Sequence, residues 1–227
     1  MLVWGKNVFN EIDLKKIRKV YLDKSSLKDY QDFLENNSIR YDIVEKRVLD
    51  DMAKKNHQGI VVDIYEYEYK NLDECLNDDF VVILDHLEDP HNFGAIIRTC
   101  ECAGIKHIVI PKDRSVRVNE TVIKVSSGAI SYVDIIMVSN LTNAMNKLKD
   151  NGFFIYGADM DGTSYLDADF SGKKVLVIGN EGKGISQIVS QGCDEIISIP
   201  MEGNINSLNA SVSAGILIYG MKRNDGK

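Results

Sequence analysis

The chain has 227 residues, 44% of them hydrophobic, so it is long and apolar enough to form one large or two small domains with buried cores. Its formal net charge of −7 argues against indiscriminate nucleic-acid binding, which depends on Lys and Arg neutralising phosphates. We expect neither a membrane span nor a secretory signal, because no run of about 18 apolar residues and no basic start before an apolar stretch occurs.

Residues 1–68 carry their own alternation of strands and helices. Three short runs are typical of strands: Ile17–Leu22, Tyr41–Val44 and Ile60–Tyr65. After the first run, Ser25 is suited to cap a helix that carries Leu27, Tyr30 and Leu34 on one face. We therefore predict a small α/β domain here.

An acidic linker is predicted at residues 69–79. Within it, Asn71–Asp79 contains four Asp or Glu residues and no Lys or Arg, and it is rich in residues that form turns. The predicted organisation is therefore a first domain at 1–68, the linker, and a second domain at 80–227.

The second domain is predicted to be an α/β fold with a parallel sheet and helices on both faces. Its Val- and Ile-rich runs are Phe80–Leu84, His107–Ile110, Val133–Met137, Phe153–Ala158, Val175–Ile178 and Glu195–Ile199, with helical stretches between them. Asn140 is suited to cap a helix in which Leu141 to Leu148 form an apolar stripe. The last helix, Leu208–Met221, is apolar on nearly every side and is expected to be buried.

Three loops of this domain follow directly after strands, in the segments Asp85–Arg98, Val175–Gly184 and Ile199–Asn209. Ligands of α/β sheets bind outside the carboxyl ends of the strands, so the three segments point to one site. The glycine spacing fits neither a P-loop nor a dinucleotide-binding fingerprint. A P-loop needs Ser or Thr after Gly182-Lys183, where this chain has Gly184, and the fingerprint needs a final glycine where this chain has Gln187.

In the first segment, Asn92 is predicted to cap a helix that starts at Phe93, and Gly94 allows a close approach of backbone or substrate. Arg98 lies off the apolar stripe of that helix and is either a surface charge or a residue facing a cleft.

The second segment has glycines at 179, 182 and 184, which leave backbone groups free for a flat ligand or simply form a turn. Its loop has one acid, Glu181. In the third segment, Ser207 could act as a helix cap, whereas Asn209 is expected in the first turn of a buried helix, where its amide needs a partner.

No metal site is predicted. Five residues could suggest zinc: His86, His91, His107, Cys100 and Cys102. The two cysteines are two positions apart on a helix and therefore point in different directions. Without a disulfide framework, the four cysteines fit a reducing cytoplasm, where we expect the protein.

Together the three segments resemble the motifs of the SpoU (TrmH-type) branch of the SPOUT RNA 2′-O-ribose methyltransferases. Asn92-Phe-Gly94 with Arg98 matches N-x-G-x-x-x-R, and Ser207-Leu-Asn209-Ala-Ser211-Val matches S-L-N-x-S-V. The resemblance covers residues 80–223 well and residues 1–66 weakly. Pro111–Ser115 and Lys124–Ala129 are similar to the subgroup that methylates a guanosine of bacterial 23S rRNA. The family resemblance implies a C-terminal deep trefoil knot and an RNA-binding first domain.

The resemblance also implies S-adenosylmethionine as cofactor, RNA as substrate, and a homodimer with its active site near the subunit contact. The implied catalytic residues are Asn92, Arg98, Glu181, Ser207 and Asn209, and the implied cofactor contacts are Gly179, Ile199, Met201 and Leu208. Asn180 departs from the family, in which many members have a small residue there. Lys112, Arg114 and Arg117 follow the second strand of this domain and either line an RNA path or form a solvated loop.

The expected reaction is attack of a ribose 2′-oxygen on the activated methyl group, for which positioning is the main requirement. Because a guanidinium keeps its proton, we expect Arg98 to grip a phosphate and stabilise the developing alkoxide, with Ser207, Glu181 or water taking the proton. Two alternatives have the same chemistry, namely a tRNA ribose methyltransferase and an antibiotic-resistance rRNA methyltransferase. A non-catalytic RNA-binding scaffold is a further alternative.

Overall fold

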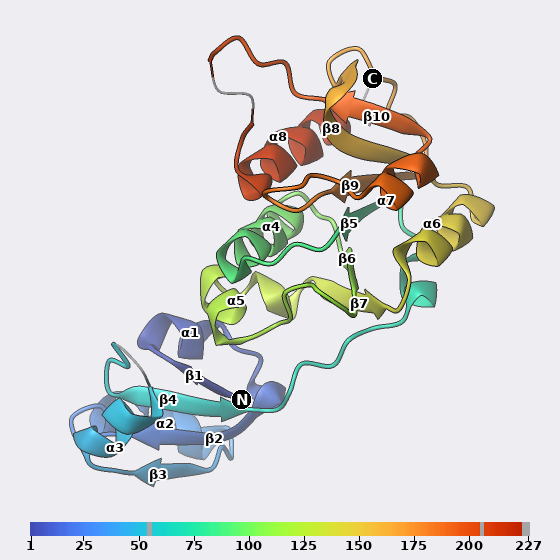
Figure 1. The fold of residues 1–227 in the computed structure, drawn as a ribbon. Coiled ribbons are helices and arrows are strands. Elements are labelled where there is room, and N and C mark those ends of the chain that lie inside the picture. Colours follow the sequence, from blue (N-terminus) through green and yellow to red (C-terminus); the bar gives the residue numbers. More distant parts are fainter. Residues whose placement is uncertain (54–55, 205–206, 224–227) are drawn as a thin grey trace. The chain divides into compact units, whose positions relative to one another are not determined.

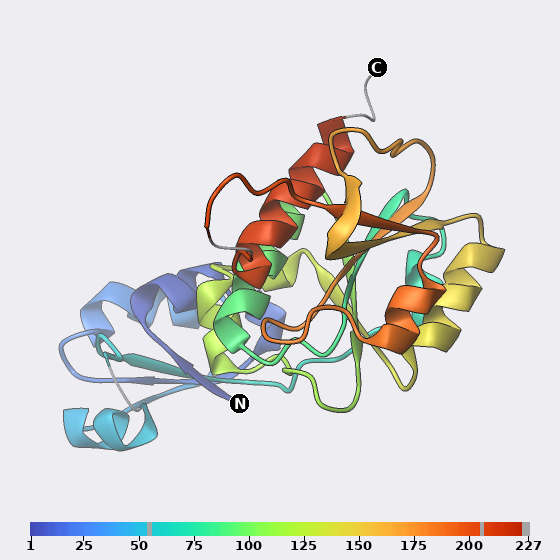
Figure 2. The ribbon, with the colours of Figure 1, turned by 45° about the horizontal axis from the view of Figure 1, so that its top comes forward.

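The computed structural model describes residues 1–53, 56–204 and 207–223. By contacts it divides into two compact units, Met1–Glu68 with Val118–Ser131, and Tyr69–Arg117 with Tyr132–Lys227. Figures 1 and 2 draw the chain from two directions, and each unit is described by itself. The predicted division into 1–68, 69–79 and 80–227 stays a proposal about how the chain is built from domains.

The first unit is built on a four-stranded sheet with the order β1-β4-β2-β3. Its strands are β1 Leu2–Trp4, β2 Ile17–Leu22, β3 Tyr41–Ile43 and β4 Ile60–Ile64. Its helices are α1 Lys6–Glu11, α2 Leu27–Asn36, α3 Lys46–Met52 and, from the second half of the sequence, α5 Glu120–Val125. Strands β2 and β3 run parallel, whereas β4 is antiparallel to both β1 and β2.

Helices cover both faces of this first sheet. On one face Leu49 of α3 packs against Val61 of β4. Elsewhere in the unit, Phe9 of α1 meets the ring of Tyr30 of α2 edge-on, with 5.2 Å between centroids. Strand β4 is therefore buried along its whole length. The predicted α/β character of this part of the chain is confirmed.

The helix cap predicted at Ser25 is wrong by one residue. Helix α2 begins at Leu27, so Ser26 occupies the cap position. The backbone N–H of Ser26 donates to Asp23 Oδ1 at 2.8 Å, and the hydroxyl of Ser25 donates to the same oxygen at 2.7 Å. The carboxylate of Asp23 therefore organises this turn, and the serine hydroxyls do not.

The second unit contains a six-stranded, fully parallel sheet with the order β10-β8-β9-β5-β6-β7. Its strands are β5 Phe80–Leu84, β6 His107–Pro111, β7 Asp134–Val138, β8 Phe154–Ser164, β9 Lys174–Ile178 and β10 Glu195–Ser198. All six predicted strands are present, and their limits agree with the prediction to within one residue. Strand β8 is the exception, because it continues past the predicted end at Ala158 to Ser164 and pairs there with β10.

Helices lie on both faces of this sheet, as predicted. They are α4 Pro90–Cys102, α6 Leu141–Asp150, α7 Gln187–Gly192 and α8 Ala210–Arg223. Figures 1 and 2 show α4 beside α8 on one face and α6 beside α7 on the other. The ammonium of Lys222 in α8 donates to the carbonyl of Ala103 just after α4 at 2.7 Å, which ties the ends of these two helices together.

The acidic segment after residue 69 packs on the second unit. Residues Leu72–Cys75 form a single 3₁₀ turn, in which Asn71 and Glu74 make a reciprocal capping box. Cys75 is fully buried among Val81, Met145 and other side chains of the sheet and of α6. Its burial raises the pKa of this thiol to about 12, so it remains protonated at neutral pH.

Two predictions about helices had different outcomes. The cap at Asn140 is confirmed, since its side-chain oxygen accepts from the N–H of Asn143 at 2.9 Å. The complete burial predicted for the last helix is wrong. Helix α8 buries Ala214 and Leu217 but leaves Val212 48% and Tyr219 54% exposed, because only one of its faces packs on α4 and the sheet.

Asp89, not Asn92, caps helix α4. The helix begins at Pro90, a residue well suited to the first helical position, and the carboxylate of Asp89 accepts from the N–H of His91 at 3.0 Å. Asn92 therefore lies inside the first turn, and the prediction that it caps the helix is wrong. Its side chain is left available for other partners.

We expect Asp89→Ala to lower the free energy of unfolding by about 1 kcal/mol, because one N–H of the first turn loses its acceptor. Asp89→Asn is the matched control, since an asparagine oxygen caps equally well and should leave the value nearly unchanged. Urea unfolding followed by circular dichroism measures both. Equal losses in the two variants would show that the cap does not stabilise α4.

Candidate active site

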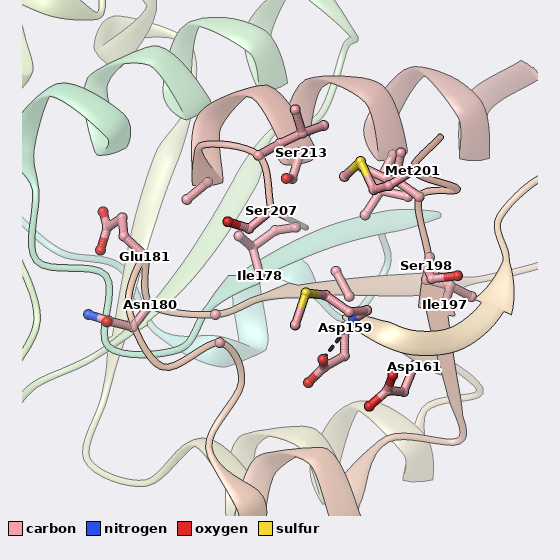
Figure 3. Close-up of a pocket in the computed structure, with 18 of the residues that line it drawn as sticks. Asp159, Asp161, Ile178, Asn180, Glu181, Ile197, Ser198, Met201, Ser207 and Ser213 are labelled. Atoms are coloured by element: carbon pink, nitrogen blue, oxygen red, sulfur yellow. Dashed lines mark hydrogen bonds between the residues drawn. The ribbon is translucent and has the colours of Figure 1, made fainter. Parts of the chain in front are cut away.

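A cavity of about 710 Å³ lies at the carboxyl ends of β9 and β10 and against the middle of β8. This is the edge of a parallel sheet at which ligands of α/β proteins bind. Figure 3 shows Asp159 and Asp161 of β8 on one wall and Ser207 and Ser213, near the start of α8, on another. All four predicted cofactor contacts line the cavity: Gly179, Ile199, Met201 and Leu208.

The loop after β9 turns back tightly on itself. The backbones of Asn180 and Gly184 exchange two hydrogen bonds of 2.9 Å, which close the loop. A Cβ on Gly179 would lie 2.0 Å from the carbonyl carbon of Gly184, so only glycine fits there. The predicted glycine-rich turn therefore has a specific cause at Gly179, namely the close approach of two backbone segments.

Asn92 and Glu181 connect the first predicted segment with the second. Asn92 is only 5% exposed, and its Nδ2 donates to Glu181 Oε1 at 2.9 Å. The two residues are 89 positions apart in the chain. Glu181 is exposed and lines the cavity. A buried amide therefore holds a carboxylate at the cavity wall.

Ser211 connects the third segment to the same group. Its hydroxyl lies 3.1 Å from Asn92 Oδ1 and 2.6 Å from Asn209 Oδ1, and its single hydrogen can be directed to either oxygen. The three segments thus meet in one hydrogen-bonded network. Ser211 was not predicted as a site residue, although its place in the S-L-N-x-S-V pattern was a usable signal.

Asn209 and Ser207 occupy positions different from those predicted. Helix α8 begins at Ala210, so Asn209 is not in a buried first turn but precedes the helix, is exposed, and accepts from the N–H of Ser211 at 2.9 Å. Asn209 rather than Ser207 is therefore the capping side chain. Ser207 is exposed and lines the cavity. Residues 205 and 206 of the predicted third segment lie outside the described part of the chain.

Arg98 lies on α4 away from the cavity wall. It is exposed, and within the described part of the chain it does not occur among the residues that line the cavity. Arg98 is six positions after Asn92, which corresponds to about 9 Å along the axis and about 1.7 turns. The two side chains therefore leave α4 on different faces, and Asn92 alone reaches the network.

The predicted basic residues lie in the loop after β6. Lys112, Arg114 and Arg117 are all exposed. The loop is attached to the turn between β5 and α4, because the N–H of Val116 donates to the carbonyl of Leu87 at 2.8 Å. This basic loop therefore borders the connection that leads into the helix carrying Asn92 and Arg98.

Acidic side chains dominate the charge of the cavity wall. Asp159, Asp161 and Glu181 line it together with one cation, Lys183. Asp159 and Asp161 were not predicted as site residues, although they come directly after Ala158, the expected end of this strand. The rule that ligands bind beyond the carboxyl ends of strands would have suggested them. A ligand with a positive centre is favoured by this wall.

The thiols of Cys100 and Cys193, near this sheet, are poor nucleophiles. Burial raises the pKa of Cys193 to about 12 and also raises the pKa of Cys100, so both thiols are protonated at neutral pH.

No group of three or more His, Cys, Asp or Glu side chains suited to a metal occurs among the described residues. Across residues 1–53, 56–204 and 207–223, no helix is long and apolar enough to cross a membrane.

The sequence matches two family models. Residues 79–219 match the SpoU rRNA Methylase family, and residues 2–70 match the RNA 2′-O ribose methyltransferase substrate binding family. The chain belongs to the SpoU rRNA methylase family. It is therefore an RNA ribose 2′-O-methyltransferase of the SpoU type, and the resemblance noted in its three loop segments is confirmed at the level of the family.

Two staphylococcal proteins and two solved structures illustrate the similarity. A protein of Staphylococcus epidermidis, provisionally assigned as a TrmH family tRNA/rRNA methyltransferase, is 41% identical over 89% of this chain and 84% of its own. A Staphylococcus aureus protein with the same assignment is 45% identical over 80% of this chain and 77% of its own.

The two solved structures share the fold of this SpoU chain. The SpoU methyltransferase AviRb of Streptomyces viridochromogenes, in complex with AdoMet, has a TM-score of 0.85, 23% identity, and coverage of 99% of this chain and 90% of its own. An AdoMet-bound rRNA methyltransferase of Sinorhizobium meliloti has a TM-score of 0.83, 23% identity, and coverage of 98% and 86%.

We predict that Gly179→Ala lowers the free energy of unfolding by about 1 to 3 kcal/mol, because the added methyl group overlaps the backbone of Gly184. Gly182→Ala in the same loop is the matched control. Its Cβ would come no closer than 3.7 Å to Asn180 Oδ1 and its φ is not positive, so a change within about 0.5 kcal/mol is expected. Similar values for the two variants in thermal unfolding would contradict the tight closure of this loop.

Proposed function

We propose that this SpoU enzyme transfers a methyl group from S-adenosylmethionine to the ribose 2′-hydroxyl of a guanosine in 23S rRNA. The observation that carries the proposal is the network of Asn92, Glu181 and Ser211 at the cavity. It joins the three segments that matched the family motifs. The family itself supports the reaction, whereas the cofactor, the nucleotide and the RNA are our inference for this chain.

The cavity fits S-adenosylmethionine in size and chemistry. Its volume of about 710 Å³ lies within the range of about 300 to 1,000 Å³ that is usual for small-molecule sites. Ile199, Met201 and Leu208 offer apolar surface for an adenine ring, next to the exposed backbone at Gly179. When bound, the cofactor supplies a methyl carbon on a positively charged sulfur. The carboxylates of the wall match the net positive charge of such a ligand.

Each catalytic candidate has a role that follows from its position. Asn92 orients the carboxylate of Glu181 through its amide. Asn209 caps α8 and so fixes the start of the helix that carries Ser211. Ser207 and Glu181 line the cavity and, with water, are our candidates for accepting the proton of the ribose hydroxyl.

Arg98 is assigned to the RNA side of the site. It is exposed on α4, outside the wall of the cavity, which suits a contact with a phosphate next to the acceptor nucleotide. A guanidinium keeps its proton at neutral pH, so Arg98 stabilises negative charge on the acceptor oxygen rather than removing its proton.

RNA binding is divided between local basic groups and the first unit. Lys112, Arg114 and Arg117 are exposed on one loop and can follow a phosphate backbone, even though the whole chain is acidic. The match of residues 2–70 to a substrate-binding family supports a second RNA contact. Two linked contacts raise the effective affinity without a basic overall charge.

We also propose a cytoplasmic homodimer with the deep trefoil knot of SPOUT enzymes. The half-exposed Val212 and Tyr219 on α8 support a subunit contact close to the site. The four free cysteines support a reducing compartment. A tRNA ribose methyltransferase and an antibiotic-resistance rRNA methyltransferase remain the alternatives with the same chemistry.

Mapping ribose methylation in RNA from cells with and without this protein tests the target. We expect one 2′-O-methylguanosine to disappear from 23S rRNA and to return with the wild-type gene but not with Glu181→Ala. Loss of a methyl group from tRNA instead would favour the first alternative. Calorimetric titration with S-adenosylmethionine tests the cofactor, and absence of binding would favour a non-catalytic scaffold.

Arg98→Lys is expected to slow single-turnover methyl transfer by about 10²- to 10³-fold, because an ammonium cannot make the bidentate hydrogen bonds of a guanidinium to a phosphate. The Kd for S-adenosylmethionine should not change, since Arg98 does not line the described wall of the cavity. Arg223→Lys, at the end of α8, is the matched control and should react at the wild-type rate. An unchanged rate for Arg98→Lys at saturating RNA would refute this role.

A further inference from the structure

Asn180 makes four hydrogen bonds within and around the loop after β9. Its backbone N–H and carbonyl pair with Gly184. Its side-chain Oδ1 accepts from the N–H of Gly182 at 3.0 Å, which tightens the turn from inside. Its Nδ2 points out of the loop and donates to the carbonyl of His86 at 3.0 Å. The side-chain amide is therefore satisfied on both ends by two different chain segments.

The partner of this amide is the turn directly after β5. Asp85, which is 1% exposed, accepts from the N–H of Ser186 through Oδ2 at 2.7 Å. Its Oδ1 lies 2.5 Å from Nδ1 of His86. The turn therefore holds the loop at both of its ends, at Asn180 through His86 and at Ser186 through Asp85. We call these two contacts the loop brace.

His86 has an uncommon backbone conformation. Its φ of +57° lies in the left-handed region, which few non-glycine residues adopt, although Asn, Asp and His adopt it more often than the others. Strained backbone of this kind persists where surrounding contacts determine it, and it often occurs at functional sites. Here the conformation places the carbonyl that receives Asn180 and the imidazole that meets Asp85.

Glu181 is connected both to the loop brace and to Asn92. It follows Asn180 directly in the chain, and its carboxylate accepts from Asn92 Nδ2. The position of this carboxylate is thus set from two directions, by the amide of Asn92 and by the backbone that Asn180 fixes. A small residue in place of Asn180 could keep the backbone pairing with Gly184, but its side chain could not reach His86.

We propose that Asn180 is a positioning residue for Glu181 and that it acts through its hydrogen bond to the carbonyl of His86. This inference rests on the proposed methyl transfer at the same cavity. Asn180 also lines the cavity, but this role needs no contact between its side chain and the cofactor or the RNA. The side chain of Asn180 thereby joins the loop after β9 to the turn after β5.

Asn180→Ser is the variant that isolates this bond. A serine hydroxyl can still accept from the N–H of Gly182, as in other side-chain turns, but it is too short to reach His86. Asn151→Ser is the matched control, because Asn151 also donates from Nδ2 to a carbonyl, that of Lys147 at 2.8 Å, at the end of α6. Both are compared with wild type and with Glu181→Ala.

The measurement is single-turnover transfer of a labelled methyl group from saturating S-adenosylmethionine to total RNA from cells lacking the protein. This RNA contains the unmodified acceptor, whichever RNA carries it. We expect Asn180→Ser to be about tenfold slower, as for other small misplacements of a catalytic group. The Kd for S-adenosylmethionine, from calorimetry, should stay within about threefold of wild type, because the backbone lining at Gly179 and Gly184 is kept. Asn151→Ser should match wild type.

A double-mutant cycle decides whether the effect passes through Glu181. When Glu181→Ala is already present, adding Asn180→Ser should change the rate by less than about twofold. A full tenfold loss in that background, a wild-type rate for Asn180→Ser, or a loss of cofactor binding in step with the rate would each overturn the inference. If wild type itself transfers no methyl group to this RNA, the proposed function fails instead.

Discussion

The hydrogen bond from Asn92 to Glu181 joins the first turn of α4 to the loop after β9, 89 residues further along the chain, and the architecture of the site depends on it. It is possible because β5 and β9 are neighbouring parallel strands, so their carboxyl ends open onto the same edge of the sheet. A buried amide needs a partner, and a carboxylate at a cavity wall needs an orienting donor. One contact satisfies both requirements, and Ser211 extends it to the third segment.

Helix capping determines which side chains remain available for this site. Asp89 satisfies the first turn of α4, and Asn209 satisfies the first turn of α8. Because Asp89 takes the capping position, Asn92 can direct its amide across to Glu181. Asn209 combines two roles, since the oxygen that caps α8 is also in reach of the hydroxyl of Ser211. Local helix stability and site geometry therefore depend on the same few polar groups.

The cavity wall and the exposed loop after β6 carry opposite charges. The cavity wall is acidic through Asp159, Asp161 and Glu181, which suits a cationic methyl donor. The exposed loop that holds Lys112 and Arg114 is basic, which suits phosphates. A chain with a net charge of −7 can act on RNA in this way, because attraction between exposed charges is local at physiological salt.

The strands of the parallel sheet, the family and part of the cavity lining could be predicted from the sequence, because hydrophobic runs, glycine spacing and the pattern around Ser207 are local properties of the chain. The exact positions of the polar residues at the starts of helices α4 and α8 could not be predicted. Asp89 caps α4 in place of Asn92, and Asn209 caps α8 instead of lying in its first turn, since several polar residues near a helix start are equally able to cap it. The extension of β8 to Ser164 and the bond from Asn180 to His86 depend on pairing between distant segments. Sequence by itself determined which residues were available for chemistry, whereas the tertiary structure alone decided which of them meet, because hydrogen-bond partners are selected by strand neighbours that are far apart in the chain.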